Sequence, residues 1–191
     1  MTLFLDLLFL VLCIAWPLGE LWIGWRHRPD NRSEVHDHGT LPVLLIVILV
    51  GIVSAVGLAY AGLAPFPRTW RLPMFATGCA LMAIGAPLRW WSVRTLSRLF
   101  TIRIAIREGH RLVRSGPYRL LRHPSYTGAL LTFSGLGLAL GDGLALIAIV
   151  APVTLAFLHR IRIEERILSQ AFPDEYPAYA RATKRLLPLL W

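Results

Sequence analysis

Charged residues and cysteines are scarce in this chain of 191 residues. Asp, Glu, Lys and Arg together make up 16% of it, whereas they make up about a quarter of a typical soluble domain. Hydrophobic residues make up 55% and gather in long runs, which excludes an ordinary soluble domain and indicates an integral membrane protein. Cys13 and Cys79 lie in apolar runs without metal-ligand spacing, which excludes a disulfide framework and a cysteine-based metal site.

Long apolar runs predict membrane-spanning helices, because about 20 apolar residues cross a hydrocarbon core of about 30 Å. Three runs meet this length, namely Leu3–Trp25, Leu41–Ala64 and Leu72–Trp91. The fourth apolar region, Tyr126–Leu158, is too long for one ordinary span, and Gly141-Asp142-Gly143 divides it near the middle. We therefore expect two short helices joined by a tight turn, the second of which can lengthen past Leu158.

The predicted fold is an all-α integral membrane protein with five transmembrane helices, the last two of which form a short hairpin. We expect one domain over residues 1–191. Within it, residues 1–91 hold three spans and short loops, and residues 92–191 hold nearly all of the unusual polar chemistry. The second half is therefore where we expect any catalytic machinery.

Positive charge is unevenly distributed along the chain. The net charge is +9, and nineteen of the twenty basic residues are arginine. With five crossings, most of them fall in three segments on the same membrane face, and only Arg68 and Arg71 clearly fall on the other. The positive-inside rule then places the basic face and the C-terminus in the cytoplasm and the N-terminus outside. Topology and attraction to anionic membrane lipids account for the charge, so we expect no nucleic-acid partner.

Arg, His and Tyr side chains are concentrated in Glu108–Gly128, the connection that leads into the fourth apolar region. Taken singly, these residues fit the anchors that mark the ends of spanning helices. Arg160 and Glu164, four residues apart, share a helix face and form either a simple ion pair or one side of a polar pocket. Charges near membrane depth are costly unless paired or used, so the two segments together favour a pocket at the membrane interface.

Four segments resemble, in their order, the signature of the isoprenylcysteine carboxyl methyltransferase family. The resemblance covers about residues 95–188. They are His110-Arg111-Leu112-Val113, Ser115-Gly116-Pro117-Tyr118, Arg122-His123-Pro124-Ser125-Tyr126 with Gly128, and Glu164-Glu165 followed by Phe172, Glu175, Tyr176 and Tyr179. Related phospholipid N-methyltransferases share a similar pattern. The resemblance implies a polytopic enzyme that uses S-adenosylmethionine. Its cofactor pocket would lie on the cytoplasmic face, between the last two spans, the preceding connection and the C-terminal segment.

The resemblance also implies roles for individual residues. It assigns Arg160 to the substrate side of catalysis, and it sets Arg103 where eukaryotic members tend to have glutamine. No metal ligands are expected, since His27, His36 and His38 have no partner at a suitable spacing. The implied cofactor contacts are His110, Leu112, Val113, Tyr118, His123, Pro124, Ser125, Tyr126 and Glu164.

The expected function is methyl transfer from S-adenosylmethionine to a lipophilic or lipidated substrate, and foremost carboxyl O-methylation of a prenylcysteine-like group. A carboxylate is already ionised near neutral pH and needs only a cation such as Arg160 to hold it, whereas an amine or a thiol first has to lose a proton. Methylation of a phospholipid amine or of a small thiol stays open as an alternative. A non-enzymatic docking or transport-associated protein is the alternative of another class.

Glycine spacing in the fourth apolar region does not fit a soluble nucleotide-binding loop. Gly135-Leu136-Gly137 begins like such a loop, but the next glycine, Gly141, comes one position too late for the GxGxxG pattern. Gly137 and Gly141 instead have the GxxxG spacing of helix packing in membranes. We therefore interpret them as a helix-packing pair.

Overall fold

Helices make up most of the computed structural model, which describes residues 2–27, 34–35, 39–101, 105–106 and 112–187. The long helices are α1 (Thr2–Arg26), α2 (Thr40–Ala61), α3 (Arg68–Leu96) and α5 (Gly143–Ala171), and the shorter ones are α4 (Pro124–Ala139) and α6 (Tyr176–Ala182). The other described elements are two 3-10 turns, η1 (Ser97–Leu99) and η2 (Gly116–Arg119), and an antiparallel pairing of β1 (Glu34–Val35) with β2 (Ala105–Ile106). The predicted all-α class is confirmed.

Four of the described helices are long and apolar enough to cross a membrane, namely Leu3–Arg26, Thr40–Ala61, Arg68–Leu99 and Gly143–Ala171. The multi-pass membrane character is therefore confirmed. The helix α4 has 16 residues, which at about 1.5 Å per residue is shorter than a hydrocarbon core of about 30 Å. The expected hairpin forms, but unequally, since α5 has 29 residues and continues past Leu158. A fifth crossing by α4 stays a prediction.

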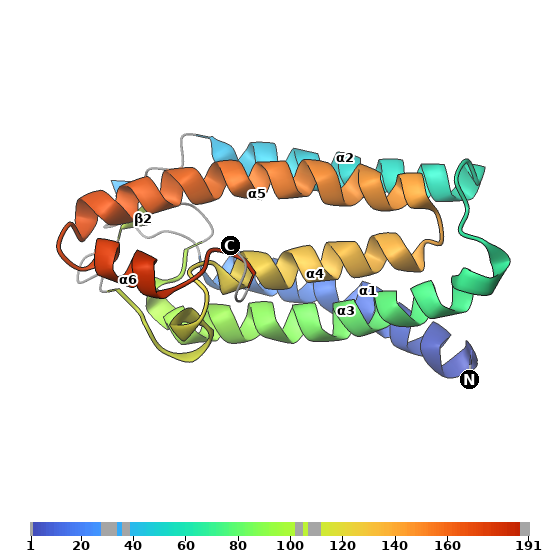
Figure 1. The fold of residues 1–191 in the computed structure, drawn as a ribbon, viewed down its shortest axis with the longest axis horizontal. Helices are drawn as coiled ribbons and strands as arrows, with labels where there is room; N and C mark the ends of the chain where they lie inside the picture. Colours follow the sequence, from blue (N-terminus) through green and yellow to red (C-terminus); the bar gives the residue numbers. More distant parts are fainter. Residues whose placement is uncertain (1, 28–33, 36–38, 102–104, 107–111, 188–191) are drawn as a thin grey trace.

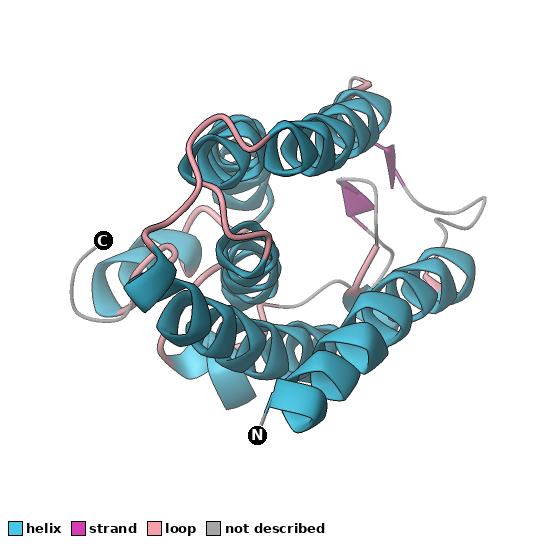
Figure 2. Cartoon of the chain, turned by 90° about the vertical axis from the view of Figure 1, so that its right-hand side faces the viewer, coloured by secondary structure: helices cyan, strands magenta, loops and turns pink. Residues whose placement is uncertain are grey.

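The helices α1 to α5 lie side by side along the long axis of the molecule, and α6 and several connections gather at one end (Figure 1). The helix α3 packs along α4 and contacts α1, while α2 packs along α5, which also contacts α4. The end-on view shows α4 between these two groups (Figure 2). Leu44, Phe133, Ile149, Val153 and Phe157 form part of the buried core where α2, α4 and α5 meet.

Glycines allow the backbones of α3 and α4 to approach closely. A Cβ atom on Gly128 would lie 2.6 Å from the carbonyl oxygen of Gly85, and one on Gly135 would lie 2.5 Å from that of Gly78. Small residues at such contacts drive helix packing in membranes, where helices gain little from the hydrophobic effect. This close approach fixes the start of α4 against the end of α3.

The structure corrects half of the interpretation of Gly137 and Gly141. Gly137 is a packing position, since a Cβ atom there would lie 2.9 Å from Cα of Leu146 on α5. Gly141 lies beyond the end of α4 and has a φ of 76°, with no atom within 4 Å of an added Cβ. Its role is conformational, because a left-handed backbone conformation is favourable only for glycine and a few other residue types.

Asp142 holds together the end of the bundle at which α4 turns into α5. It is 1% exposed, and its carboxylate accepts hydrogen bonds from N–H of Ala145 at 3.0 Å and N–H of Ala64 at 2.7 Å. The first bond caps the start of α5, and the second ties the α2–α3 connection to the hairpin. The backbone bond from N–H of Ala145 is the main cause that lowers the pKa of Asp142 below its ordinary value.

We predict that Asp142→Ala lowers the midpoint of thermal unfolding in detergent by several degrees, because two backbone N–H groups lose their acceptor. A lowered pKa means that this stabilisation is complete above the ordinary pKa of about 4 and is lost as pH falls through the folded value. The difference between wild type and variant should therefore shrink in acid. Asp174→Ala, which removes an exposed aspartate between α5 and α6, is the control. An unchanged midpoint for Asp142→Ala would contradict the assignment.

Candidate active site

A cavity of about 870 Å³ lies between the helices, near the upper end of the range for ligand pockets, about 300–1,000 Å³. Its described lining comes from α1, α2, α3, α4, α5, α6 and the connection that precedes α4. The residues from α1 and α2 are mostly apolar, among them Trp16, Leu44, Ile48 and Ile52, whereas α4 and α5 contribute polar groups. One space therefore joins an apolar wall to a polar wall.

Most of the predicted site residues line this cavity. They are Leu112, Val113, Tyr118, His123, Ser125, Tyr126, Arg160 and Glu164. Pro124 is buried at the first position of α4 and is not among the lining residues. His110, Arg103, His36 and His38 lie outside the described residues. Segments 34 or more residues apart in the sequence thus meet in one place, and the roles of their residues stay a proposal.

The start of α4 sets His123 and Tyr126 in the cavity wall. His123 precedes the helix, is 4% exposed, and stacks on Tyr126 with ring centroids 5.8 Å apart. Its Nδ1 lies 3.7 Å from Oε2 of Glu164, and its Nε2 lies 3.4 Å from Oε1 of Glu165. Tyr126 packs in turn on Phe157, at 4.8 Å between centroids. The imidazole is thus wedged between an aromatic ring and the two acidic side chains of α5.

Glu164 offers an unused acceptor to the cavity. Its Oε2 is buried and has no hydrogen-bond partner among the described residues. Buried polar atoms normally have such a partner, so an unpaired carboxylate oxygen in a cavity wall suits a ligand with N–H or O–H donors. Burial, followed by the charge of Glu164, raises the pKa of the neighbouring Tyr118 well above its ordinary value. Tyr118 therefore stays neutral and keeps its hydroxyl proton at physiological pH.

Arg160 reaches across the cavity wall from α5 towards α2. It is 3% exposed, its Nη1 donates to Oγ1 of Thr40 at 3.0 Å, and its Nε donates to the Tyr126 hydroxyl at 3.4 Å. These bonds hold a cation at the boundary between the polar and the apolar lining. The position fits a residue that orients a negatively charged group on an otherwise apolar ligand.

Glu20 and Arg89 form an ion pair in the cavity wall that sequence reasoning missed. Nη2 of Arg89 donates to Oε2 of Glu20 at 2.6 Å, and Nε donates to the other carboxylate oxygen. Nη1 of Arg89 donates to Oγ of Ser125 at 2.9 Å. A signal was available, because a charge inside an apolar run marks a paired or functional group, and both residues lie inside predicted spans.

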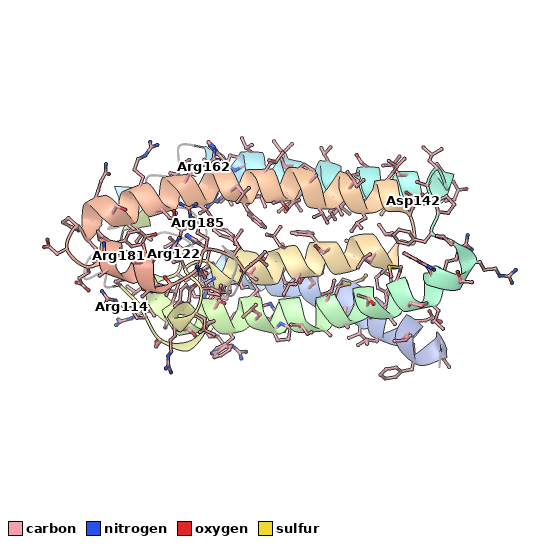
Figure 3. All side chains as sticks on the ribbon, in the orientation of Figure 1. Arg114, Arg122, Asp142, Arg162, Arg181 and Arg185 are labelled. Atoms are coloured by element: carbon pink, nitrogen blue, oxygen red, sulfur yellow. The ribbon has the colours of Figure 1, made fainter. Side chains whose placement is uncertain are left out.

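Arg122 and Glu165 join the C-terminal segment to the site. Nε of Arg122 donates to Oε1 of Glu165 at 2.9 Å, and Nη2 of Arg185 lies 2.9 Å from Oε2 of the same carboxylate. Nη1 of Arg122 donates to the carbonyl oxygen of Ala180 at 2.6 Å. Figure 3 shows Arg122 and Arg185 at the end of the bundle opposite Asp142.

Further bonds fasten the same segment along the connection before α4. N–H of Arg122 donates to the carbonyl oxygen of Lys184 at 2.7 Å, and Oγ1 of Thr127 donates to that of Leu186 at 2.7 Å. The Tyr179 hydroxyl donates to the carbonyl oxygen of Tyr118 at 2.9 Å, and burial raises the pKa of Tyr179 to about 12. The C-terminal segment is therefore fastened against the cavity, which Tyr179 lines.

Sequence comparison relates this chain to one family of proteins. The sequence model of the isoprenylcysteine carboxyl methyltransferase (ICMT) family matches residues 77–170. Protein-S-isoprenylcysteine O-methyltransferase B of Arabidopsis thaliana is 32% identical over 175 residues, which cover 86% of this chain and 88% of that protein. A probable protein-S-isoprenylcysteine O-methyltransferase of Oryza sativa subsp. indica is 36% identical over 115 residues, 59% of this chain and 60% of that protein.

A relative with a different name matches over a similar length. Cobalt-zinc-cadmium resistance protein CzcN of Cupriavidus metallidurans is 34% identical over 169 residues, which cover 87% of this chain and 70% of that protein. The family match thus includes proteins named for methyl transfer and proteins named for metal resistance. The match to the Arabidopsis thaliana protein over most of both chains, together with the family model, shows that this chain belongs to the isoprenylcysteine carboxyl methyltransferase family.

Proposed function

We propose that this protein transfers a methyl group from S-adenosylmethionine to a lipophilic acceptor. One observation carries the proposal, namely that a single cavity joins polar residues of α4 and α5 to apolar residues of α1 and α2. A polar cofactor and an acceptor with a hydrophobic tail need these two kinds of wall to meet. Family membership supports the same reaction class.

The chemistry of the polar wall fits this cofactor. The unpaired oxygen of Glu164 suits an ammonium or hydroxyl donor, and Tyr118 and His123 offer buried hydrogen-bonding groups beside it. When bound, the cofactor supplies a methyl group on a positively charged sulfur. We assign its binding to Leu112, Val113, Tyr118, His123, Ser125, Tyr126 and Glu164, with His110 as a further contact. Pro124 starts α4, the helix that carries Ser125 and Tyr126.

The residues of this chain contribute orientation and exclusion of water rather than acid–base chemistry. The packed rings of His123, Tyr126 and Phe157 and the fastened C-terminal segment enclose the polar wall. Holding two reactants in the right geometry, away from water, lowers a displacement barrier by several kcal/mol. A site of this kind needs an acceptor that is already ionised or easily made so.

The preferred acceptor is the carboxylate of a prenylcysteine-like group. Such a carboxylate is ionised near neutral pH, with a reference pKa of about 3.5, so no base is needed. Arg160, fixed by Thr40 at the boundary of the apolar lining, would hold it, and the residues of α1 and α2 would hold the prenyl chain. The arginines at this end of the bundle (Figure 3) support a cytoplasmic site under the positive-inside rule.

Two alternatives are distinguishable by experiment. Methylation of a phospholipid amine or a small thiol would use the same cofactor pocket with a different acceptor. The name of one relative, CzcN, refers to resistance to cobalt, zinc and cadmium. In this chain, the described residues contain no group of three or more His, Cys, Asp or Glu side chains that could hold a metal ion. A docking or transport-associated protein would not bind the cofactor.

We predict that Glu164→Ala weakens cofactor binding about 10- to 100-fold, because a hydrogen bond to a charged group contributes about 1.5–3 kcal/mol. Arg160→Ala should leave the cofactor Kd within about twofold and lower turnover about 100-fold, the effect of losing a charge-stabilising group. Calorimetric titration in detergent with S-adenosylhomocysteine measures binding. Asp174→Ala and Arg162→Ala, which remove exposed charges nearby, are the controls. No binding by wild type would contradict the proposed function, and loss of cofactor binding in Arg160→Ala would contradict the assignment of Arg160 to the substrate.

We predict that labelled S-adenosylmethionine transfers its label to an S-farnesylated N-acetylcysteine, and that base treatment releases it as methanol, since a methyl ester is hydrolysed by base. Dioleoylphosphatidylethanolamine and benzenethiol are assayed in parallel. Base-stable label in the phospholipid would instead identify an amine acceptor, and label in the thiol would identify a thioether product. Either result without ester formation would contradict the carboxylate assignment.

A further inference from the structure

The ion pair of Glu20 and Arg89 joins two spans far apart in the sequence. Glu20 lies in α1 and Arg89 in α3, and their side chains are 29% and 14% exposed. Charged side chains within spanning segments are costly and usually mark a functional site. Glu20 lies outside the part of the chain that matches the family model, residues 77–170. Its contact with Arg89 ties α1 to the wall of the cavity.

The guanidinium of Arg89 keeps donors available for a ligand. It has five N–H bonds, of which two are used by Glu20 and one by Ser125 among the described residues. One N–H remains on Nη1 and one on Nη2, and both nitrogens belong to the outer edge of the guanidinium plane. Because Arg89 lines the cavity, this edge suits the two oxygens of a carboxylate.

The helix α1 fixes the orientation of that edge. Trp16 and Glu20 are four residues apart and therefore share a helix face. The carboxylate of Glu20 holds the guanidinium from the side, and the ring of Trp16 lies 5.8 Å from its central carbon. The plane of Arg89 is thus held at one edge by an ion pair and across one face by an aromatic ring.

Arg160, another arginine that lines the cavity, has a parallel arrangement. Arg160 is held by Thr40 at the start of α2, as Arg89 is held by Glu20 in α1. Arg89 also contacts Ser125 and Arg160 contacts Tyr126, which are neighbours in the first turn of α4. The first two spans therefore each fix one arginine, and the two arginines meet adjacent residues of α4.

We propose that Glu20 is a positioning residue for the acceptor, and that it holds Arg89 so that the outer edge of the guanidinium receives the acceptor carboxylate beside Arg160. This inference rests on the proposed function. The acceptor contacts Arg89, and Glu20 acts through Arg89 without touching the acceptor. Removal of the Glu20 charge should therefore affect recognition of the acceptor and leave cofactor binding unchanged.

The test measures KM for S-farnesylated N-acetylcysteine and the Kd of S-adenosylhomocysteine in detergent. Glu20→Gln should raise KM about tenfold, as expected when a charged hydrogen-bonding partner is lost, with Kd within about twofold of wild type. Arg89→Lys should raise KM similarly, because lysine lacks the planar fork. The double variant should add little to Arg89→Lys alone, since residues that act through one contact are not additive.

Asp6→Asn is the matched control, because it removes an exposed acidic charge from the same helix away from the cavity. It should change neither KM nor Kd. Glu20→Asp keeps the charge but shortens the side chain by one methylene group, and it should raise KM less than Glu20→Gln does. If thermal unfolding shows that Glu20→Gln does not fold, the KM of Glu20→Asp decides.

Three outcomes would overturn the inference while leaving methyl transfer intact. The first is an unchanged KM in the folded Glu20 variants. The second is a rise in the cofactor Kd by the same factor as KM, and the third is full additivity of Glu20→Gln with Arg89→Lys. If wild type transfers no label to the farnesylated probe, the proposed acceptor is wrong and the inference falls with it.

Discussion

Charges buried in an apolar helix bundle need partners from other helices, and the site depends on this pairing. Glu20 of α1 meets Arg89 of α3, Glu165 of α5 meets Arg122 before α4, and Thr40 of α2 meets Arg160 of α5. Removing one partner from either of the two ion pairs leaves a partly buried charge uncompensated. The pairs therefore set the relative positions of the helices around the cavity as well as its electrostatic character.

Close backbone packing brings these partners within reach of one another. A Cβ atom on Gly128 would lie 2.6 Å from the carbonyl oxygen of Gly85 and 2.7 Å from the backbone nitrogen of Arg89. Ser125 lies one turn before Gly128 on α4, so the glycine contact also sets the hydrogen bond from Arg89 to Ser125. At the opposite end, Asp142 ties the hairpin to the α2–α3 connection, which fixes the other end of the same helices.

Local patterns predicted much of this structure, because they depend on neighbours in the sequence. Apolar runs predicted the spans, and Gly141-Asp142-Gly143 predicted the turn between α4 and α5. The positive φ of Gly141 and the helix cap by Asp142 explain why the chain turns there. Most of the described residues proposed for the site line one cavity. The function expected of these motifs came from the family resemblance, because composition alone does not indicate it.

Contacts between distant segments were predicted only where the family resemblance implied them. The pairing of Glu20 with Arg89 joins residues 69 positions apart, and no local pattern shows which buried charges meet. The contribution of α1 and α2 to the cavity was likewise missed, because an apolar run looks the same whether it faces lipid or a ligand. The interpretation of Gly141 as a packing residue was wrong because α4 ends before it.

The central claim is that one cavity serves both the polar cofactor and the hydrophobic tail of the acceptor. Photolabelling with an S-farnesylated N-acetylcysteine that carries a diazirine at the end of its prenyl chain tests it directly. Adducts that unlabelled probe displaces should fall on the cavity-lining residues of α2, Leu44, Ile48 and Ile52. Adducts confined to residues on the exposed side of the same helix, such as Val43 and Val53, or adducts that unlabelled probe does not displace, would contradict the account.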